Sequence, residues 1–162
     1  MTQMQRGMPI QFEPKKVNRF VLEFPNELNI ESWLVQTSGR PKMKINPVKI
    51  DYLNSASYVA GKYEWEAITI KFIDPIGPST SSKIMEWVRL HAESMTGRMG
   101  YAAGYMKDLI IKSLDPVGTD VEKWVLHESM ITAIDFGDND HGNDELQMVT
   151  ITVQPRFCEL SY

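Results

Sequence analysis

The sequence predicts a mainly β domain, an antiparallel β-sandwich or barrel of about seven to eight strands with one amphipathic helix. Apolar residues recur at every second position over most of the chain, which is the period of strands. These runs are short and end at Pro, Gly, Asn and Asp, the residues that favour turns. Only the stretch around residues 83–92 changes to the period of a helix. The helix is therefore expected to cover one side or opening of the β structure.

Residues 63–92 show both periods in succession. In the first part, Ile68, Ile70 and Phe72 share one face of an alternating strand. Two prolines end this strand, and Ser79–Ser82 then offers side-chain oxygens to cap a helix. The apolar stripe of that helix consists of Ile84, Trp87, Val88 and His91. We expect this stripe to pack on the apolar face of the preceding strand.

Further strands are predicted along the rest of the chain. They cover residues 17–24, 33–38, 44–50, 105–114, 121–128, 129–136 and 146–157. The runs at 33–38 and 44–50 are expected to pair as a hairpin, in which Pro47 restricts the second strand to an edge or a bulge. In the last strand, apolar residues alternate with threonines, which predicts one buried face and one hydroxyl-rich, hydrated face.

The stretch Asp51–Lys62 is predicted to be a long loop, because small and polar residues dominate it. The larger side chains set among them are Tyr52, Leu53, Tyr58 and Val59. A loop of this length with aromatic side chains can dock another chain. It can equally fold back on its own domain as an ordinary hairpin loop, and the sequence favours neither alternative.

A length of 162 residues suits one domain with its own core. We divide the chain into a flexible N-terminal arm at residues 1–16, a β domain at 17–157 and a C-terminal tail at 158–162. The arm contains prolines and has no periodicity, as is typical of chain ends. We find neither an apolar core of signal-peptide length nor a stretch that approaches a membrane span, so we expect a chain that is not secreted by the standard route.

Motifs and composition argue against an enzyme. The local signatures of nucleophile elbows and phosphate-binding loops are absent from the sequence, and His91, His127 and His141 lack metal-ligand spacing. No catalytic residue, cofactor or metal is therefore predicted. The net charge of −4 argues against a broad basic face for nucleic acid, and the positive stretch Pro41–Lys49 is typical of a solvated hairpin. The single cysteine, Cys158, excludes an internal disulfide.

The densest acidic run is Asp135–Glu145, which raises the question of calcium. Asp138, Asp140 and Asp144 could supply oxygen ligands at short spacing. Gly142 is the fifth residue counted from Asp138 instead of the sixth, and no glutamate stands at the twelfth position. The pattern therefore predicts a hydrated hairpin turn.

Four motifs follow one another between residues 18 and 157. They are the strand N-R-F-V-L-E-F, the segment from V-K-I-D-Y to V-A-G-K-Y-E-W-E-A-I-T-I-K-F, the helix with E-W-V, and the closing tryptophan strand with E-S-M-I-T-A-I-D-F-G-D-N-D and a last alternating strand. In this order they resemble the tail-tube protein of contractile phages, the family of the T-even tail tube. That family is similar in fold to the tube protein of the type VI secretion system. The N-terminal arm and the C-terminal tail depart from the pattern.

The resemblance implies a structural virion protein that forms hexameric rings, stacked helically into a tail tube that conducts DNA. It implies contacts between subunits at Tyr52, Leu53, Tyr58, Val59, Phe12, Phe157 and Tyr162. For the acidic residues that would face the lumen, position on the predicted strands indicates Glu64, Glu66, Glu122 and Glu128. An acidic or neutral lining would let DNA slide, because DNA carries dense negative charge. The implied partners are further copies of the chain, the sheath, baseplate and terminator proteins, genomic DNA and the tape-measure protein, without a membrane or a cofactor. Assembly is expected in the host cytoplasm.

Other functions remain open at this point. A baseplate tube initiator or a tube subunit of a type VI or tailocin-like system fits the same residues. A small ligand-binding β-barrel is an alternative from a different class, and a buried apolar pocket with convergent polar groups would favour it. An enzyme has no specific motif in its support.

Overall fold

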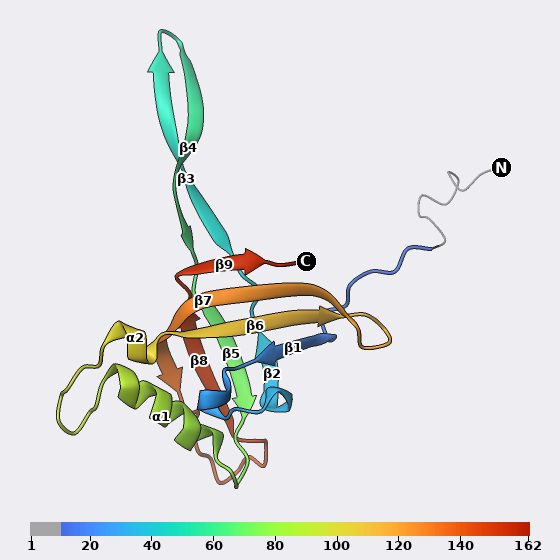
Figure 1. Cartoon of the computed structure of the whole chain (residues 1–162), viewed down its shortest axis with the longest axis vertical. Coiled ribbons are helices and arrows are strands. Elements are labelled where there is room, and N and C mark those ends of the chain that lie inside the picture. The colour runs from blue at the N-terminus through green and yellow to red at the C-terminus, as the bar shows by residue number, and fades with distance from the viewer. Residues whose placement is uncertain (1–10) are drawn as a thin grey trace.

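The computed structural model of the chain describes residues 11–162, so residues 1–10 of the predicted arm lie outside the described part. Figure 1 shows a β body with helix α1 (Thr80–His91) packed on it and a two-stranded hairpin that projects far from it. A one-turn helix, α2 (Ala102–Tyr105), follows α1. All strand pairs between the named strands are antiparallel. The predicted mainly β fold is confirmed.

The strands of the described chain differ widely in length. They are β1 (Phe20–Glu23), β2 (Val35–Ser38), β3 (Met43–Tyr52), β4 (Ser55–Trp65), β5 (Ile68–Ile73), β6 (Lys107–Leu114), β7 (Asp120–Asp135), β8 (Met148–Gln154) and β9 (Phe157–Leu160). Two short 3₁₀ turns, Asn26–Leu28 and Ser32–Leu34, connect β1 with β2.

Strand β7 organises the body because it belongs to both parts of one bent sheet. Its first half pairs with β6 on one edge and with β9 on the other. Its second half pairs with β8, and the full order is β1-β6-β7-β8-β5-β2. The backbone of Glu128 has φ 49° where β7 passes from one part to the other. This left-handed conformation is uncommon for a non-glycine residue and marks the bend between the two parts.

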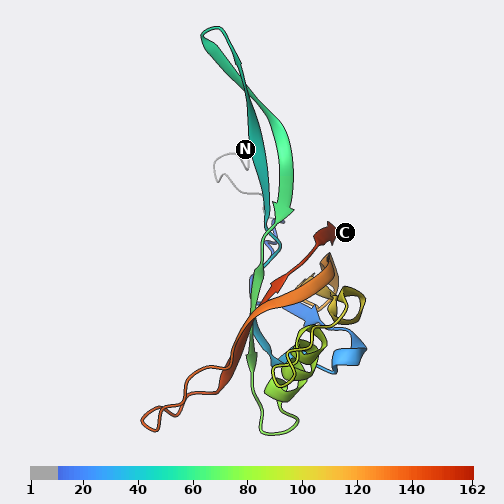
Figure 2. The same cartoon turned by 90° about the vertical axis from the view of Figure 1, so that its left-hand side faces the viewer.

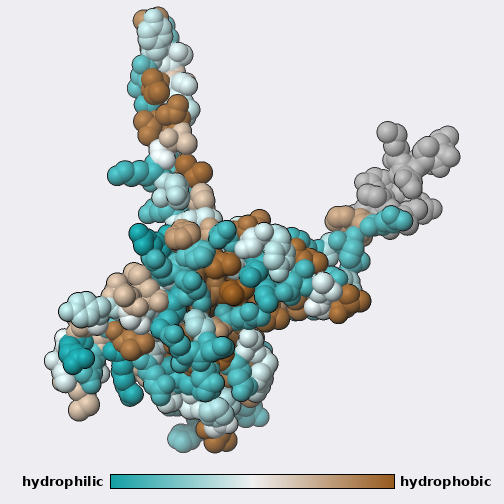
Figure 3. Space-filling view, viewed as in Figure 1, coloured by the Kyte–Doolittle hydropathy of each residue, from teal (hydrophilic) through white to brown (hydrophobic). Residues whose placement is uncertain are grey.

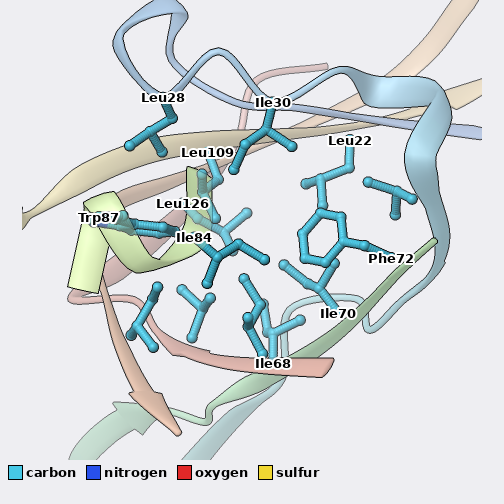
Figure 4. Close-up of a cluster of buried hydrophobic side chains, with 14 of the residues drawn as sticks. Leu22, Leu28, Ile30, Ile68, Ile70, Phe72, Ile84, Trp87, Leu109 and Leu126 are labelled. Atoms are coloured by element: carbon cyan, nitrogen blue, oxygen red, sulfur yellow. The ribbon is translucent and has the colours of Figure 1, made fainter. Parts of the chain in front are cut away.

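A hydrophobic cluster fills the space between the two parts of the sheet and helix α1 (Figure 4). Ile70 and Phe72 from β5 and Leu126 from β7 are fully buried, and α1 contributes Ile84 and Trp87. Full burial of one such aliphatic or Phe side chain stabilises the fold by roughly 1.5–3 kcal/mol. The predicted packing of the helical stripe on the apolar face of β5 is confirmed.

At the start of helix α1, side-chain oxygens accept hydrogen bonds from backbone N–H groups of the first turn. Ser79 is the N-cap, and its hydroxyl accepts the N–H of Ser82 at 3.4 Å. The carboxylate of Asp74, which follows β5, accepts the N–H of Thr80 at 3.0 Å. The negative charge at this end of the helix also opposes the positive end of the helix dipole. The predicted serine cap is confirmed, and Asp74 is an addition from the structure.

The structure corrects the predicted pairing of residues 33–38 with 44–50. β2 pairs with β5 instead, and β3 pairs with β4, which occupies most of the stretch predicted to be a loop. Small residues such as Ser55 and Ala56 hide the alternation of β4, because they give little contrast in hydropathy. Pro47 lies at a register shift of this pair, so its predicted place at an edge or a bulge is confirmed.

Other boundaries also differ from the prediction. The two predicted strands at 121–128 and 129–136 are one continuous strand, β7, which ends at Asp135, whereas the predicted strand 146–157 is divided at a proline into β8 and β9. Proline has no N–H for the ladder, which explains the interruption. Residues 158–160, predicted to belong to a tail, lie in β9, where the side chain of Cys158 is buried.

Candidate self-assembly surface

The hairpin of β3 and β4 stands clear of the body in both views (Figures 1 and 2). Its register runs from Met43↔Trp65 at the root to Tyr52↔Ser55 at the tip. The 10 residues of β3 span roughly 34 Å at about 3.4 Å per residue. Every residue of β3 is exposed, and in β4 only Gly61 and Trp65 are partly covered. An isolated two-stranded ribbon is marginally stable in water, so the two strands by themselves stabilise this hairpin little.

The apolar surface of the hairpin changes face along its length. Near the root, Ile45 lies opposite Tyr63, and both side chains point to one face. Between Ile45 and Pro47 the register shifts by one extra residue in β4, so that Pro47 pairs with Ala60. Beyond this bulge, most of the exposed apolar side chains lie on the opposite face of the hairpin. They are Val48, Ile50, Tyr52 and Val59. The hairpin therefore offers apolar contacts on both faces.

Gly61 permits the bulge. A Cβ atom at this position would lie 2.6 Å from the carbonyl oxygen of Asn46 and 2.9 Å from a methyl group of Val48. The first distance is far shorter than a nonbonded carbon–oxygen contact allows, and the backbone oxygen cannot rotate away. The bulge, which brings Val59 opposite Val48 and so onto the same face, thus depends on a residue without a side chain.

Four of the residues predicted to contact other subunits lie on this hairpin. Tyr52 and Leu53 form its tip and are 73% and 88% exposed, and Tyr58 and Val59 are exposed on β4. Figure 3 shows apolar side chains gathered along the projecting ribbon. The stretch does not fold back on its own body, so one of the two alternatives for it is excluded.

The charge of the hairpin differs from that of the body. Residues 42–65 contain Lys42, Lys44, Lys49 and Lys62 against Asp51 and Glu64, a net charge of +2. The whole chain has a net charge of −4, which leaves −6 for the remainder. A basic projection and an acidic body are complementary between two copies of the same chain.

The sheet of the body ends in open edges. Within residues 11–162, β2 pairs only with β5, and β1 pairs only with β6. The second half of β7 pairs with a strand on one edge only, through β8. Unpaired strand edges present N–H and C=O groups that can pair with another chain. The part β2-β5-β8-β7 is therefore a four-stranded sheet that is open on both sides.

One face of this four-stranded sheet is polar. Its other face carries the core, and in Figure 2 helix α1 lies on that core side. In the pair Thr69↔Thr152 two hydroxyl groups stand next to one another across the strands, and Lys71 lies opposite the hydroxyl of Thr150. The face also contains Thr37 and Asp135, paired with Lys71 and Thr150. This confirms the predicted alternation of one apolar and one hydroxyl-rich face in β8.

The structure places the four predicted lumen residues in different surroundings. Glu64 and Glu66 are exposed near the root of the hairpin, and Glu128 is partly buried and paired with Arg156. Glu122 is only 5% exposed, and its carboxylate lies in ion pairs. We correct the prediction for Glu122, because a buried and paired carboxylate offers no free charge to a channel.

Several donors converge on Glu122. Lys15 and Arg40 form ion pairs with it, and the indole N–H of Trp124 donates to Oε1 at 2.6 Å. Burial by itself would raise the pKa of Glu122, but the hydrogen bonds from Lys15, Trp124 and Arg40 outweigh it and lower the pKa to about 2. The group is therefore ionised at any physiological pH.

The sequence reasoning missed the role of Glu122, although a signal for it exists. Glu122, Trp124 and Leu126 alternate on one face of β7, and the last two give that face its apolar character. A carboxylate at an inward position of such a face requires a cationic partner. That partner, Arg40, is 82 residues distant in sequence, so the sequence alone does not identify it.

The remaining predicted contact residues lie near the chain ends. Phe12, Phe157 and Tyr162 are 55%, 42% and 57% exposed. The carbonyl oxygen of Tyr162 accepts the N–H of Lys123 at 3.0 Å, so the C-terminus continues the pairing of β9 with β7. Phe157 stacks on His127 with ring centroids 4.5 Å apart. These side chains leave only part of their surface to a neighbour.

Among residues 11–162, no group of three or more His, Cys, Asp or Glu side chains could hold a metal ion. In the acidic run, Asp135 and Asp140 accept the backbone N–H groups of Gly137 and Gly142, as in turns. No helix in the same range is long and apolar enough to cross a membrane.

Comparison with solved structures identifies the same fold in contractile injection systems. A chain in the cryo-EM structure of the anti-feeding prophage cap, the tube-terminating cap, has a TM-score of 0.74 and 15% identity, covering 99% of both chains. A chain of the PVC sheath/tube terminator, from an extracellular contractile injection system, has a TM-score of 0.75 and 14% identity, covering 94% of this chain and 99% of that one. A chain of the PVC sheath-tube complex has a TM-score of 0.73 and 13% identity, covering 99% and 98%.

No protein-family model matches the chain, and a search of curated proteins finds no match either. At 13–15% identity, the similarity to the three structures establishes a shared fold over almost the whole chain. The shared fold extends beyond the core to nearly the full length of the chain, because each alignment covers almost all of both proteins.

Proposed function

We propose that the chain is the subunit of a tube in a contractile injection system or contractile phage tail, and that it acts as a structural protein. One observation carries the proposal: a hairpin with exposed apolar residues on both faces projects from the body, and within the described chain its two strands pair only with each other. A tube requires contacts that repeat without limit, and a projecting element that docks on the next copy supplies them. The shared fold with chains from contractile injection systems supports this reading.

The open edges of the four-stranded sheet suit closure into a ring. The free edge of β2 in one copy would pair with the second half of β7 in the next, a head-to-tail contact that closes by rotation. In a ring of six, about 24 strands spaced about 4.8 Å apart give a backbone circumference of roughly 115 Å. This corresponds to a diameter of roughly 37 Å before strand tilt. Such a ring would enclose a channel.

We assign the hydroxyl-rich face of this sheet to the channel wall. In the middle of the face, Lys71 and Asp135 carry opposite charges and flank Thr150, so their charges largely cancel. A wall with little net charge does not hold a charged cargo, which suits a conduit for DNA or another polymer. Glu64 and Glu66 remain proposed lining residues at the end of the wall nearest the hairpin.

The proposed partners follow from the same assembly. Copies of the chain would contact one another through the hairpin, the sheet edges and the side chains at the chain ends. A sheath would cover the outer surface that includes α1, and baseplate and terminator proteins would contact the two ends of the tube. Neighbours of this fold occur in sheath-tube and baseplate structures, which supports these partner classes.

Electron microscopy of the purified full-length chain tests the proposal. Rings and stacked tubes are expected as the protein concentration rises, with sedimentation velocity as an independent measure. A variant in which residues 44–63 are replaced by a short Gly-Ser turn should keep the melting temperature of the body but form no tubes. A wild-type chain that remains monomeric at every concentration, alone and with tube fragments added as seeds, would overturn the proposal.

A protein that ends or initiates the tube is a second candidate. The fold neighbours include a terminating cap and a terminator as well as a sheath-tube complex. Such a protein would form a single ring or a short stack, whereas a tube subunit would form stacks of unlimited length. The length distribution of the particles in the same micrographs therefore separates the two candidates.

The filled interior speaks against a ligand-binding barrel. The space between the two parts of the sheet is occupied by fully buried side chains, among them Phe72, Trp87 and Leu126 (Figure 4). A small-molecule site needs a cavity of about 300 Å³ or more. The hollows of this size are open depressions at the surface, outside the filled interior: about 680 Å³ at the turn of residues 137–148, about 740 Å³ beside β1 and β2, and about 470 Å³ beside α2.

A further inference from the structure

Two side chains of β7 hold the root of the hairpin. Glu122 and Trp124 are two residues apart and lie on the inward face of the strand. The carboxylate of Glu122 pairs with Arg40, which stands just before β3. The indole of Trp124 meets the indole of Trp65, the last residue of β4, edge to face with ring centroids 6.4 Å apart. Neighbouring side chains of one strand thus contact both the entry and the exit of the hairpin.

The two contacts are linked to each other. Trp124 donates its indole N–H to the same carboxylate oxygen of Glu122 that pairs with Arg40. The backbone carbonyl of Trp65 also accepts a hydrogen bond from the side chain of Gln154 at 2.7 Å. We call Arg40, Trp65, Glu122 and Trp124 the hairpin clamp. Charge-assisted hydrogen bonds are about twice as strong as neutral ones, so the carboxylate is the central member of the clamp.

The same carboxylate anchors the N-terminal segment. Lys15 pairs with the second oxygen of Glu122, while Arg40 and Trp124 share the first. A single buried side chain therefore joins three parts of the molecule: the segment that leads to the N-terminus, the hairpin and β7. Because Lys15 and Arg40 are 55% and 63% exposed, loss of the carboxylate would return both cations to water.

We propose that Glu122 is a positioning residue for assembly, which sets the direction of the hairpin and anchors the N-terminal segment in one geometry. The proposal rests on the proposed function, in which the hairpin docks on a neighbouring copy. A lever of roughly 34 Å moves its tip by roughly 6 Å when its root turns by about 10°. A displacement of that size exceeds the tolerance of a hydrogen bond or a packed contact. The clamp therefore determines whether the tip meets its site on the next copy.

The direction of the hairpin can be measured on the single subunit. In a Cys158→Ser background, spin labels at Leu53→Cys on the tip and Val117→Cys on the β6–β7 turn report the distance between hairpin and body. Both positions are highly exposed, at 88% and 85%. The measurement is made at a dilution at which the chain is monomeric. When Glu122→Gln is added to this labelled chain, the distribution of distances is expected to broaden. Glu128→Gln, the matched control on the same strand, is expected to leave it narrow.

Single-contact variants separate the two functions of the carboxylate. Arg40→Gln should broaden the distance distribution and leave the N-terminal segment protected. Lys15→Gln should leave the distribution unchanged and raise the rate of tryptic cleavage after Lys16 by about tenfold, the effect of losing one charge-assisted hydrogen bond. Glu122→Gln should show both effects. These two variants keep the test valid even if Glu122→Gln fails to fold, because their side chains are exposed.

The outcomes also distinguish this proposal from the proposed function. If Glu122→Gln and Arg40→Gln both keep a narrow distance distribution, the clamp does not position the hairpin and the proposal is overturned. Equal broadening in Glu128→Gln would overturn it as well, because the effect would then be general loosening of β7. If the clamp behaves as expected but the wild type forms no rings or tubes, the proposed function fails on its own.

Discussion

The imidazole of His91 joins helix α1 to strand β7, because its Nε2 accepts the N–H of Ile131 at 3.2 Å. Its Nδ1 lies 3.0 Å from the carbonyl oxygen of Trp87, so a neutral ring with the proton on Nδ1 satisfies both contacts. The ring also stacks on Tyr105 with centroids 4.3 Å apart. Protonation of Nε2 would place its N–H against the N–H of Ile131. Both groups are donors, so the contact between α1 and β7 would break.

We therefore expect acid to weaken the attachment of α1. Burial lowers the pKa of His91 below its usual value of 6.5, although the hydrogen bond to Trp87 opposes this shift. The unfolded chain thus binds the proton more readily than the folded one. The stability due to the neutral ring is fully present above about pH 6.5 and is lost as the pH falls towards the lower pKa of the folded state. Melting temperatures between about pH 7.5 and about pH 5 measure this loss.

His91→Gln is the control for this pH dependence, because glutamine does not titrate. The variant should have a lower melting temperature than the wild type at neutral pH and a smaller decrease on acidification. Loss of one neutral hydrogen bond costs about 1 kcal/mol, or roughly 2–4 °C for a domain of this size. Identical pH profiles for both proteins would show that His91 does not carry the effect.

Two isoleucines provide a matched test of core against assembly surface. Ile70 is fully buried in β5, whereas Ile50 is 50% exposed on the hairpin. Ile70→Ala should destabilise the body by about 2–5 kcal/mol, because it removes buried methyl groups and leaves a cavity. Ile50→Ala should change stability by less than about 0.5 kcal/mol but reduce tube formation. Chemical denaturation measures the first effect and electron microscopy the second. Normal tubes from Ile50→Ala and similar single substitutions of Val48 and Tyr52 would exclude this face from assembly.

The bulge of the hairpin is expected to be intolerant of side chains. Gly61→Val would bring a Cβ atom within 2.6 Å of the carbonyl oxygen of Asn46 and force the register of β3 and β4 to change. Tube formation should be lost while the melting transition of the body is retained. Gly104→Ala is the control, since nothing lies within 4 Å of a Cβ at that position. Unimpaired tubes from Gly61→Val would show that the change of face at the bulge is dispensable.

Asp74 is expected to stabilise the start of helix α1. Its carboxylate accepts the N–H of Thr80 at 3.0 Å and the hydroxyl of Ser81 at 2.5 Å. Asp74→Ala should lower the free energy of unfolding by about 0.5–2 kcal/mol, the range for loss of a capping side chain. Thermal and chemical denaturation measure the change, with Asp138→Ala in the exposed acidic turn as the control. If the two variants were equally stable, Asp74 would not contribute to capping helix α1.

The thiol of Cys158 is expected to be unreactive in the native protein. Burial raises its pKa to about 11, so almost no thiolate is present at pH 8. Iodoacetamide should alkylate it slowly in buffer and rapidly in denaturant, with mass spectrometry as the readout. In the Leu53→Cys variant, the new thiol at the exposed tip should react quickly under native conditions. Rapid native alkylation of Cys158 would mean that β9 detaches readily from β7.

Local patterns predicted the elements of the body well, because each pattern has one local cause. The alternation of Ile68, Ile70 and Phe72 and the stripe of Ile84 and Trp87 identified β5, α1 and their contact. β4 was missed because its small residues blur the alternation, and the pairing of β2 was wrong because strands adjacent in sequence were assumed to be adjacent in space. The structure instead joins β2 to β5 and lets β3 and β4 pair with each other outside the body.

The candidate self-assembly surface was only partly predictable, because part of it also depends on contacts between segments that are distant in sequence. Tyr52, Leu53, Tyr58 and Val59 were identified as large side chains in a stretch without a core pattern, and all four are exposed. Glu122 was assigned to the lumen because strand position alone does not show which face is buried. Two of its three partners, Lys15 and Arg40, come from segments that are distant in sequence, and such contacts cannot be derived from periodicity.

The sequence by itself determined the mainly β class, the position and cap of the helix, and the apolar faces of the central strands, because period and capping chemistry act within a few residues. Only the tertiary structure decided that residues 43–65 leave the body as a hairpin and that Glu122 and Trp124 hold its root. These features depend on which distant segments meet when the sheet bends at Glu128. A pattern that spans a few residues contains no information about such contacts.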